Sequence, residues 1–261
     1  MLILLHTSKT MREPSQITDL SLSRPVLLNE AHKLANELQR LSDSDIEIMM
    51  KVSPKLAAET KELIAAWTDN DGDQRAAVDS FLGDIYSGLQ VQDWNEEDRG
   101  YAQKNLRILS GLYGVLKPLD GIFPYRHEMG YKIPRAEHKN MYAFWGTKIA
   151  DTLPNDGPIV NLTAVEYGKT ITKYVDPDRI ITPKFLTVSP KTGEPAFVTV
   201  HAKIARGAFA RWLIVDRVVN VKDIRWFAQL GYRYDEALST SLQPVYVCET
   251  FEGLGLSVRS K

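Results

Sequence analysis

Two glycines three residues apart, Gly111 and Gly114, could bring the backbone close to a phosphate, because neither has a Cβ atom that resists a positive φ. The apolar residues before them have helical spacing. The segment resembles a helix-hairpin-helix motif, whose turn offers N–H groups to DNA phosphates without reading the base sequence. Arg107 and Lys117 flank the turn and could add charge contacts. The usual motif has one residue between its glycines and this chain has two, so a helix that ends at Gly111 before a tight turn is an equal alternative.

The next segment, residues 117–130, combines prolines and glycines with tyrosine, arginine, histidine and glutamate. Prolines and glycines fix the path of a loop, and ordered loops often hold functional side chains. Arg126 could bind a phosphate through two parallel hydrogen bonds. Alternatively, Arg126 forms an ion pair with Glu128 or Asp120 that only fixes the loop.

Lys203 and Arg206 belong to a helix that we expect to begin near Lys203. At 100° per residue they share one stripe with Arg217, while Phe209 and Leu213 lie on the opposite, core side. A basic stripe near a helix N-terminus favours anion binding. An ordinary amphipathic helix with a solvated basic face is the commoner case.

Four polar residues lie at or after the carboxyl ends of segments 2–6 and 158–162, which we expect to be strands. These residues are Lys9, Asn161, Tyr167 and Lys169. Ligands of open α/β sheets bind at the carboxyl ends of the strands. The four residues are therefore candidates for a pocket that binds a small anionic molecule, and His6 is placed like Lys9. Helix capping or simple solvation explains them as well.

Motifs that would identify a reaction or a cofactor are absent from the sequence. It has no Walker phosphate loop, dinucleotide-binding glycine motif, nucleophile elbow or zinc-protease motif. The five histidines are scattered, so we expect no metal site and no cofactor, and catalytic residues stay unassigned. Residues 69–73 are similar to the start of a calcium loop, but Ser80 stands where the bidentate acid belongs, so we expect a surface turn.

The composition is typical of a globular protein from a reducing compartment. Apolar residues make up 44% and charged residues 25% of the chain. The single cysteine, Cys248, has no intramolecular disulfide partner, and we expect a buried inert thiol rather than a peroxide sensor. The apolar start is too short for a signal peptide, and no apolar run could cross a bilayer. We expect a cytoplasmic protein that does not bind a membrane.

Charge is unevenly distributed along the chain although its sum is -1. Residues 69–99 contain nine acids and two bases, whereas residues 101–135 contain six bases and two acids. Residues 201–217 contain four bases and one acid. A fold can gather two basic segments into one positive cleft. Two separate solvated faces are an equally good interpretation.

Apolar periodicity and turn residues predict an alternation of strands and helices. We expect strands at residues 2–6, 158–162, 179–188, 196–201 and 244–248, and near Tyr232. We expect helices that begin near residues 25, 42, 53, 95 and 203, and a further helix over residues 140–153. This mixture predicts an α+β (mixed α/β) fold in a single compact domain that covers residues 1–261.

Several blocks of the sequence, in this order, resemble the YaaA family. They are residues 53–57, 83–89, 106–130, 142–146, 161–162, 166–167, 202–207 and 231–232. The block at residues 106–130 ends in Pro-Tyr-Arg-His-Glu-Met-Gly and is too long for a chance match. Two loops depart from the family: its Ser-Pro-Ala-Lys is His6-Thr7-Ser8-Lys9 here, and its Asn-Leu-Ala-Ser is Asn161-Leu162-Thr163-Ala164.

The resemblance implies a compact α+β domain with a helix-hairpin-helix-like element beside a positively charged cleft. It also implies binding to double-stranded or branched DNA and a role in limiting peroxide damage, linked to lowering free iron. The residues that we expect to contact DNA are Arg107, Gly111, Gly114, Lys117, Arg126, Lys203 and Arg206. Substitution of Lys117, Arg126 or Arg206 is expected to weaken binding to all DNA sequences alike.

The alternative is an enzyme that acts on a nucleotide or another phosphorylated small molecule in the same cleft. Lys9 or Lys203 would then be its base or nucleophile. Direct iron sequestration is a third hypothesis, but the sequence shows no suitable cluster of ligands.

Overall fold

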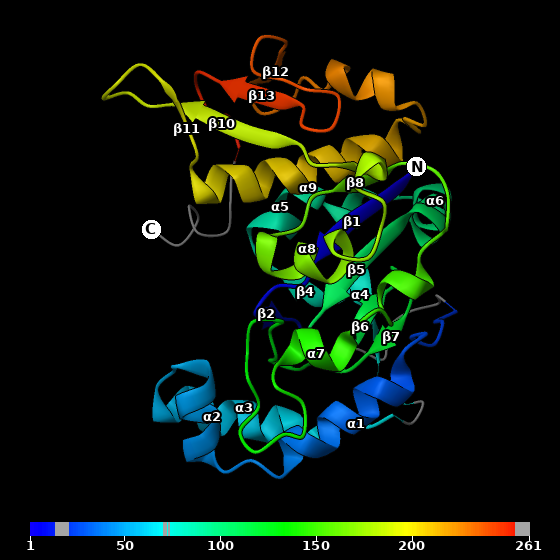
Figure 1. Ribbon diagram of the computed structural model, residues 1–261, viewed down its shortest axis with the longest axis vertical. Coiled ribbons are helices and arrows are strands. Elements are labelled where there is room, and N and C mark those ends of the chain that lie inside the picture. Colours follow the sequence, from blue (N-terminus) through cyan, green and yellow to red (C-terminus); the bar gives the residue numbers. More distant parts are fainter. Residues whose placement is uncertain (14–20, 70–71, 73, 254–261) are drawn as a thin grey trace.

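The computed structural model describes residues 1–13, 21–69, 72 and 74–253, and its centre is a five-stranded sheet of order β6-β5-β1-β8-β9 (Figure 1). The strands are β1 (Leu2–His6), β5 (Leu106–Ser110), β6 (Gly114–Leu116), β8 (Ile159–Asn161) and β9 (Ile180–Ile181). β5, β1, β8 and β9 are parallel, and β6 is antiparallel to β5. β1 and β8 are buried along their whole length, as continuous apolar runs predict, and the strands expected at both places are confirmed.

A second sheet has the order β11-β10-β13-β12. Its strands are β10 (Lys184–Val188), β11 (Pro195–Ala196), β12 (Tyr232–Asp235) and β13 (Val245–Cys248). β10 is parallel to β13, and the other two pairs are antiparallel. The closing strands near Tyr232 and residue 244 are confirmed, but the strand expected at residues 196–201 is wrong, because a helix begins at Thr199.

That helix, α9 (Thr199–Val215), lies between the second sheet and α5 (Asp84–Leu89) (Figure 1). On the sheet side, the Phe209 ring packs 5.7 Å from the ring of Phe185 on β10. On the other side the two helix backbones touch, because a Cβ atom on Gly207 would overlap the carbonyl oxygen of Ile85. α9 is therefore fixed on both sides.

Arg217 lies beyond the end of α9, so the predicted stripe of Lys203, Arg206 and Arg217 is wrong. Arg217 instead forms an ion pair of 2.8 Å with Asp98 and lies over the ring of Tyr101. The core side of the helix is as expected, since Phe209 and its neighbour one turn later are fully buried.

Three helices form the lower end of the molecule in Figure 1: α1 (Leu28–Gln39), α2 (Asp43–Met50) and α3 (Pro54–Ala66). The Ser42 side chain accepts a hydrogen bond from an N–H group of the first turn of α2, and Ser53 does the same for α3. Both caps satisfy N–H groups that a helix start leaves free, and both predicted starts are confirmed.

The other helices are α4 (Ala77–Ser80), α6 (Glu96–Asn105), α7 (Met141–Trp145) and α8 (Val165–Thr172), with 3-10 turns η1 (Val91–Asp93), η2 (Ala150–Thr152), η3 (Pro177–Arg179) and η4 (Val221–Trp226). Two short antiparallel pairs are β2 (Thr10–Met11) with β4 (Phe81–Leu82), and β3 (Arg75–Ala76) with β7 (Gly121–Ile122). Asn95 caps α6 as expected. The helix expected over residues 140–153 is shorter, because Gly146 takes φ +50 and ends α7.

The segment from Gly111 to Gly114 is the turn of a β-hairpin, so the helix-hairpin-helix prediction is wrong. β5 and β6 pair directly across it, with Ser110 opposite Gly114. Both glycines are buried, and the Trp145 indole N–H donates to the carbonyl oxygen of Gly111 at 3.1 Å. The misleading signal was apolar spacing, because a strand buried on both faces lacks the alternation that separates it from a helix. The mixed α/β fold itself is confirmed.

Candidate functional site

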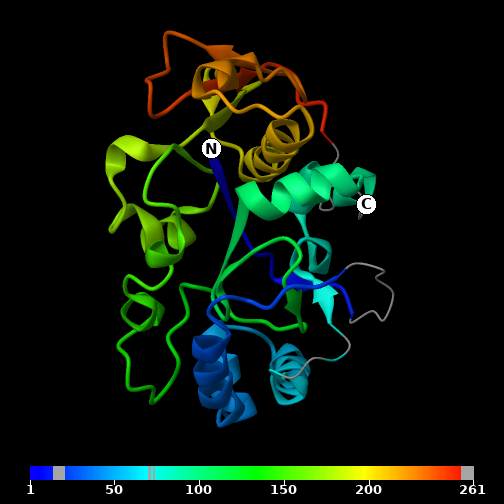
Figure 2. The ribbon, with the colours of Figure 1, turned by 90° about the vertical axis from the view of Figure 1, so that its right-hand side faces the viewer.

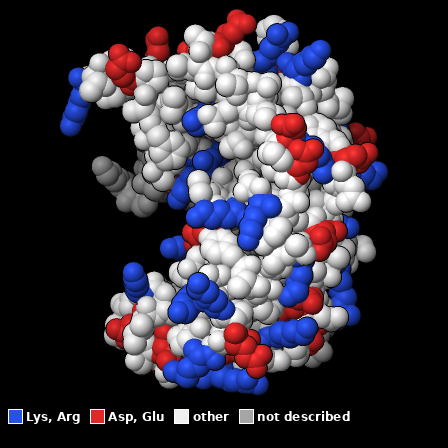
Figure 3. Space-filling view, in the orientation of Figure 1, with Lys and Arg blue, Asp and Glu red and all other residues white. Residues whose placement is uncertain are grey.

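One side of the molecule is hollowed between α9 above and α2 and α3 below, where Figure 1 places β2. Figure 3 shows Lys and Arg side chains around this hollow. We use the term basic hollow for the surface of Lys9, Arg126, Lys203 and Arg206, which approach the end of β1 and the loop at residues 126–131 from different elements. Its inner groups lie at the carboxyl ends of β1 and β8, where open α/β sheets bind ligands.

His6 ends β1 and fixes the base of the hollow. Its Nδ1 accepts a hydrogen bond from the Ala164 N–H at 3.3 Å, and its carbonyl oxygen accepts one from the Tyr86 hydroxyl at 3.1 Å. Burial, together with the charges of Arg206 and Lys203, lowers the pKa of His6 to about 3. The imidazole is therefore neutral at pH 7 and holds the start of α8 against the end of β1.

A chain of buried hydroxyl and carboxyl groups continues from Thr7. The Thr7 hydroxyl lies 3.2 Å from the hydroxyl of Tyr167, which in turn lies 3.2 Å from Oε1 of Glu128. Because the phenol has one proton and Glu128 accepts it, the Thr7 hydroxyl donates to the phenol oxygen. Burial raises the pKa of Tyr167 well above its usual range, and the Glu128 charge adds to the effect. Tyr167 therefore stays protonated and acts as a donor.

Glu128 faces both positive and negative groups. Its Oε2 lies 3.9 Å from Nζ of Lys9, and the Glu128 side chain is only 15% exposed. Burial raises the pKa of Glu128, Lys9 opposes that rise, and Glu166 reinforces it. Hydrogen bonding by Tyr167 and the charge of Lys203 favour the ionised form.

Glu166 is held beside Glu128 by its own contacts. Its Oε1 accepts a hydrogen bond of 2.6 Å from the N–H of Gly130, and its carbonyl oxygen accepts one from the Tyr142 hydroxyl at 3.0 Å. Two carboxylates with different surroundings thus lie among cations, an arrangement that can separate an acid from a base.

Lys203 and Arg206 are half-buried cations that make no hydrogen bond or ion pair with any described residue. Burial lowers the pKa of Arg206. The close packing of Gly207 against α5 fixes the helix that carries both side chains. Their positive charge is therefore held in place and available to an anion.

Arg126 lies at the α3 side of the hollow. Its guanidinium lies 3.9 Å from a carboxylate oxygen of Glu59 and donates to the Thr60 hydroxyl at 3.3 Å. The ion pairs that the sequence suggested, with Glu128 or Asp120, are not formed among the described residues, and Arg126 is fixed to α3 instead.

The other two small-molecule candidates form no hydrogen bond or ion pair with Glu128 among the described residues. The Asn161 side-chain oxygen accepts hydrogen bonds from the N–H and the hydroxyl of Thr163, so it shapes the loop after β8. Lys169 lines a different pocket, of about 500 Å³, between α7 and the second half of α8. Of the four candidates, Lys9 and Tyr167 therefore meet at Glu128.

Arg107 and Lys117 lie away from the basic hollow. Arg107 donates to the carbonyl oxygens of Gln103 at 3.2 Å and Leu106 at 2.7 Å, at the end of α6. α6 faces the viewer in Figure 2, on the side opposite the hollow. The N–H of Lys117 donates to Asp120, whose pKa burial raises. Both residues stabilise local structure, and the turn glycines beside them are buried.

Sequence reasoning missed two members of the site. The sequence suggests Glu128 only as a partner of Arg126 and suggests no role for Glu166. The available signal was their position, since each acid stands next to or near a tyrosine or arginine in an ordered loop or at a helix start. The pairing of acids with cations depends on how α8 and α9 pack against the end of β1. The spacing of residues in the sequence does not predict that packing.

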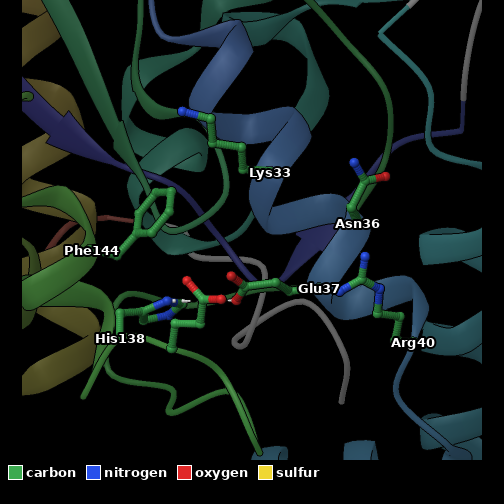
Figure 4. A pocket seen from close by; sticks show the side chains of 7 residues that line it. Lys33, Asn36, Glu37, Arg40, His138 and Phe144 are labelled. Carbon is green, nitrogen blue, oxygen red and sulfur yellow. Dashed lines mark ion pairs between the residues drawn. The ribbon is translucent and has the colours of Figure 1, made fainter.

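A second pocket, of about 490 Å³, lies between α1 and the segment before α7. Lys33, Asn36 and Glu37 of α1 and Arg40 just after it line the pocket with His138 and Phe144, and Figure 4 shows Glu37 pointing toward His138. Nδ1 of His138 lies 3.6 Å from Oε2 of Glu37. The cations Lys33 and Arg40 are balanced by Glu37 and Glu137, so this pocket has no surplus of positive charge.

Within the described part of the chain, no three His, Cys, Asp or Glu residues are grouped so that they could hold a metal ion. The acidic turn at residues 69–73 lies partly outside the described residues. None of the described helices combines the length and apolar character needed to cross a bilayer.

Comparison with known proteins places the chain in a family. The family described as peroxide stress protein YaaA matches residues 1–238. A UPF0246 protein of Salinispora tropica is 52% identical over 259 residues, which cover 99% of this chain and 98% of the relative. UPF0246 proteins of Clostridium perfringens and Colwellia psychrerythraea are 40% and 38% identical, and the matches cover 92% of this chain and 96% and 95% of those proteins. The chain belongs to the family of the peroxide stress protein YaaA, and this membership supports a role in peroxide stress.

Proposed function

We propose that the basic hollow binds the phosphate backbone of double-stranded or branched DNA, and that the protein thereby limits oxidative DNA damage during peroxide stress. The observation that carries this proposal is the pair Lys203 and Arg206, two half-buried cations on a closely packed helix without a hydrogen bond or ion pair to any described residue. Lys9 and Arg126, from distant segments, extend the positive surface on either side. Phosphate contacts of this kind bind DNA without reading its sequence.

The proposal differs from the sequence expectation in which residues touch DNA. Gly111 and Gly114 are buried in a β-hairpin, and Arg107 is bonded to the end of α6. The proposed contacts are therefore Lys9, Arg126, Lys203 and Arg206. Because each of them neutralises a phosphate and releases counterions, affinity should fall steeply as salt rises.

The test is fluorescence anisotropy with a labelled duplex and a labelled four-way junction, titrated across a salt series. Lys203→Ala and Arg206→Ala should each weaken binding to both DNAs and lower the salt slope by about one. The matched control is Lys222→Ala, because Lys222 is exposed on η4 and forms no ion pair with a described residue. Unchanged affinity and slope in both hollow variants would remove the proposal.

A second candidate function is an enzyme that acts on a nucleotide or another phosphorylated small molecule. The observation that favours it is the buried Tyr167–Glu128 pair beside Lys9, since a DNA backbone site does not need a buried acid. A thermal-shift series with nucleotides separates the two candidates, because a ligand of the folded state raises the unfolding temperature. Absence of any shift at millimolar nucleotide would count against an enzyme of this class.

A further inference from the structure

The innermost part of the basic hollow contains more cations than carboxylates around a half-buried acid. Lys9 and Lys203 act on Glu128, which Glu166 adjoins, and Lys203 and Arg206 act on His6 at the end of β1. If both acids are ionised, this part of the hollow contains three cations and two carboxylates. If Glu128 is neutral, the surplus is two positive charges, which matches the charge of a phosphate monoester near pH 7.

Glu128 is the acid whose surroundings permit a neutral form. Groups from every element packed against it face its carboxyl: Lys9 after β1, Glu166 and Tyr167 of α8, Lys203 of α9, and Tyr125 and Tyr131 of its own segment. Its one hydrogen bond to a described residue is the Tyr167 phenol at 3.2 Å, and Lys9 is farther away at 3.9 Å. Glu166 is anchored better, by the Gly130 N–H at 2.6 Å.

An anion that enters this space brings a second negative charge next to Glu128. A buried carboxylate beside a like charge ionises less readily, because its proton relieves the repulsion. A protonated carboxyl also gains one O–H donor, and phosphate oxygens are strong acceptors.

We propose that the inner part of the basic hollow is a phosphate-monoester site in which Glu128 binds as a neutral carboxylic acid and donates a hydrogen bond to a phosphate oxygen. Lys203 and Arg206 bind the remaining phosphate oxygens, and Lys9 stays beside Oε2 of Glu128. The inference rests on the proposed function only in that both use the cations of the hollow. The proposed site distinguishes two kinds of phosphate. A terminal or free phosphate reaches Glu128, whereas an internal phosphodiester carries one charge and stays at the rim of the hollow.

Binding in this site is coupled to proton uptake, because Glu128 is more protonated in the complex than in the free protein. Affinity therefore rises as pH falls, by at most about tenfold per pH unit, until the free carboxyl is itself protonated. The phosphate monoester itself titrates near pH 6. The effect of Glu128 is therefore measured as the difference in affinity between the wild-type protein and Glu128→Gln at the same pH.

The test is isothermal titration calorimetry with AMP at pH 7.5, in two phosphate-free buffers of different ionisation enthalpy. The wild-type protein should take up a proton fraction on binding. Glu128→Gln should show none and should bind AMP several-fold more tightly, because the amide N–H₂ donates without first taking a proton. Arg206→Ala should lose binding. Glu236→Gln, an exposed acid on the far turn after β12, is the matched control and should behave as the wild type.

The two sources of a phosphate monoester are separated by a second set of titrations. A 5′-phosphorylated oligonucleotide is compared with the same strand bearing a 5′-hydroxyl, and with AMP alone. Preference for the phosphorylated strand over AMP assigns the site to DNA ends, and equal or tighter AMP binding assigns it to a free nucleotide. Circular dichroism of each variant shows that the fold is retained.

The inference is overturned if AMP and the phosphorylated strand bind without proton uptake, if Glu128→Gln weakens binding as much as Arg206→Ala, or if neither ligand binds. If duplex binding is salt-dependent and Glu128→Gln does not change it, the proposed function would still be supported without this inference. Conversely, proton-linked AMP binding without duplex binding would retain the inference and remove the proposed function.

Discussion

His6 and His127 are buried imidazoles, and burial is the main reason why the pKa of each falls to about 3. Nδ1 of His127 has no hydrogen-bond partner among the described residues. In the unfolded chain both groups take a proton near pH 6.5. Between pH 6.5 and pH 3 the unfolded state therefore binds more protons than the folded state, and stability is lost as pH falls through this range.

We expect the free energy of unfolding to fall by at most about 1.4 kcal/mol per pH unit for each of these histidines. His127→Gln should reduce that acid sensitivity, as measured by urea unfolding at pH 7, 6 and 5. His32→Gln is the comparison and should not reduce the acid sensitivity, because the His32 side chain is 45% exposed and its Nδ1 lies 2.8 Å from a carboxylate oxygen of Asp69. Equal pH dependence in the wild-type protein and His127→Gln would contradict the assignment.

Cys248 is fully buried in β13, and burial raises the pKa of its thiol. Only a thiolate reacts readily, so the native thiol should resist thiol reagents and peroxide. At pH 8, a chromogenic disulfide reagent should label no thiol in the folded protein and one after denaturation in guanidinium. Rapid labelling of the native protein would reopen a sensor role for this residue.

Single residues of the site were partly predictable. Lys9 and Tyr167 were predictable because each follows a recognisable buried strand, and ligand-binding residues often lie at the carboxyl ends of strands. Glu128 was not predictable. The sequence suggests an ion pair of Arg126 with Glu128 or Asp120 inside one loop, whereas the structure pairs Glu128 with Tyr167 of α8 and with Lys9 after β1.

At the scale of elements, the contact between α5 and α9 decides where Lys203 and Arg206 lie. Gly88 and Gly207 face the backbone of the opposite helix, and a Cβ atom on either would overlap a carbonyl oxygen. Two helices can approach this closely only where both lack side chains, and extra atoms at such a contact force backbone shifts.

Gly207→Ala should therefore destabilise the fold by about 1–3 kcal/mol and weaken anion binding, because α9 has to move. Gly100→Ala is a matched control, since Gly100 is exposed on α6 and its added Cβ would meet nothing within 4 Å. That change should be neutral or stabilise by about 0.5–1 kcal/mol through helix propensity. Equal stability of the two variants in urea unfolding would disprove close contact between α5 and α9.

Element ends were more predictable than element types. Ser42, Ser53 and Asn95 each cap a helix as expected, because a cap depends only on the residues of one turn. The apolar residues before Gly111, whose spacing indicates a helix, form the strand β5, since burial on both faces comes from neighbours distant in sequence. Thr199 similarly begins a helix inside an expected strand, because α9 is buried between two layers.

Across the whole molecule, the basic segments are divided between two sides. Arg126, Lys203 and Arg206 lie at the hollow, whereas Arg107 is bonded to the end of α6 on the other side. Charge counts along the chain could not separate these sets, because the fold distributes one segment over both sides. The electrostatic field of the charged side chains therefore favours anions at the hollow, although the net charge of the chain is -1.

This division predicts that Lys117→Ala leaves DNA affinity within about twofold of the wild type, because a cation beyond a Debye length contributes little. The Lys117 side chain is exposed and only its backbone N–H is bonded, so the fold should tolerate the change. The measurement is the same anisotropy series, with Lys203→Ala beside it. A loss as large as that of Lys203→Ala would mean that DNA also contacts the α6 side.

The position of β1 in the middle of its sheet has a consequence for how the chain is made. β1 is translated long before its partners β5 and β8, which begin only at Leu106 and Ile159. Until those residues leave the ribosome, Leu2–His6 is an apolar strand with open edges, which can pair with another copy or recruit a chaperone. A message truncated before Ile159 would therefore yield a chain that aggregates, and the second half of translation determines when the fold can form.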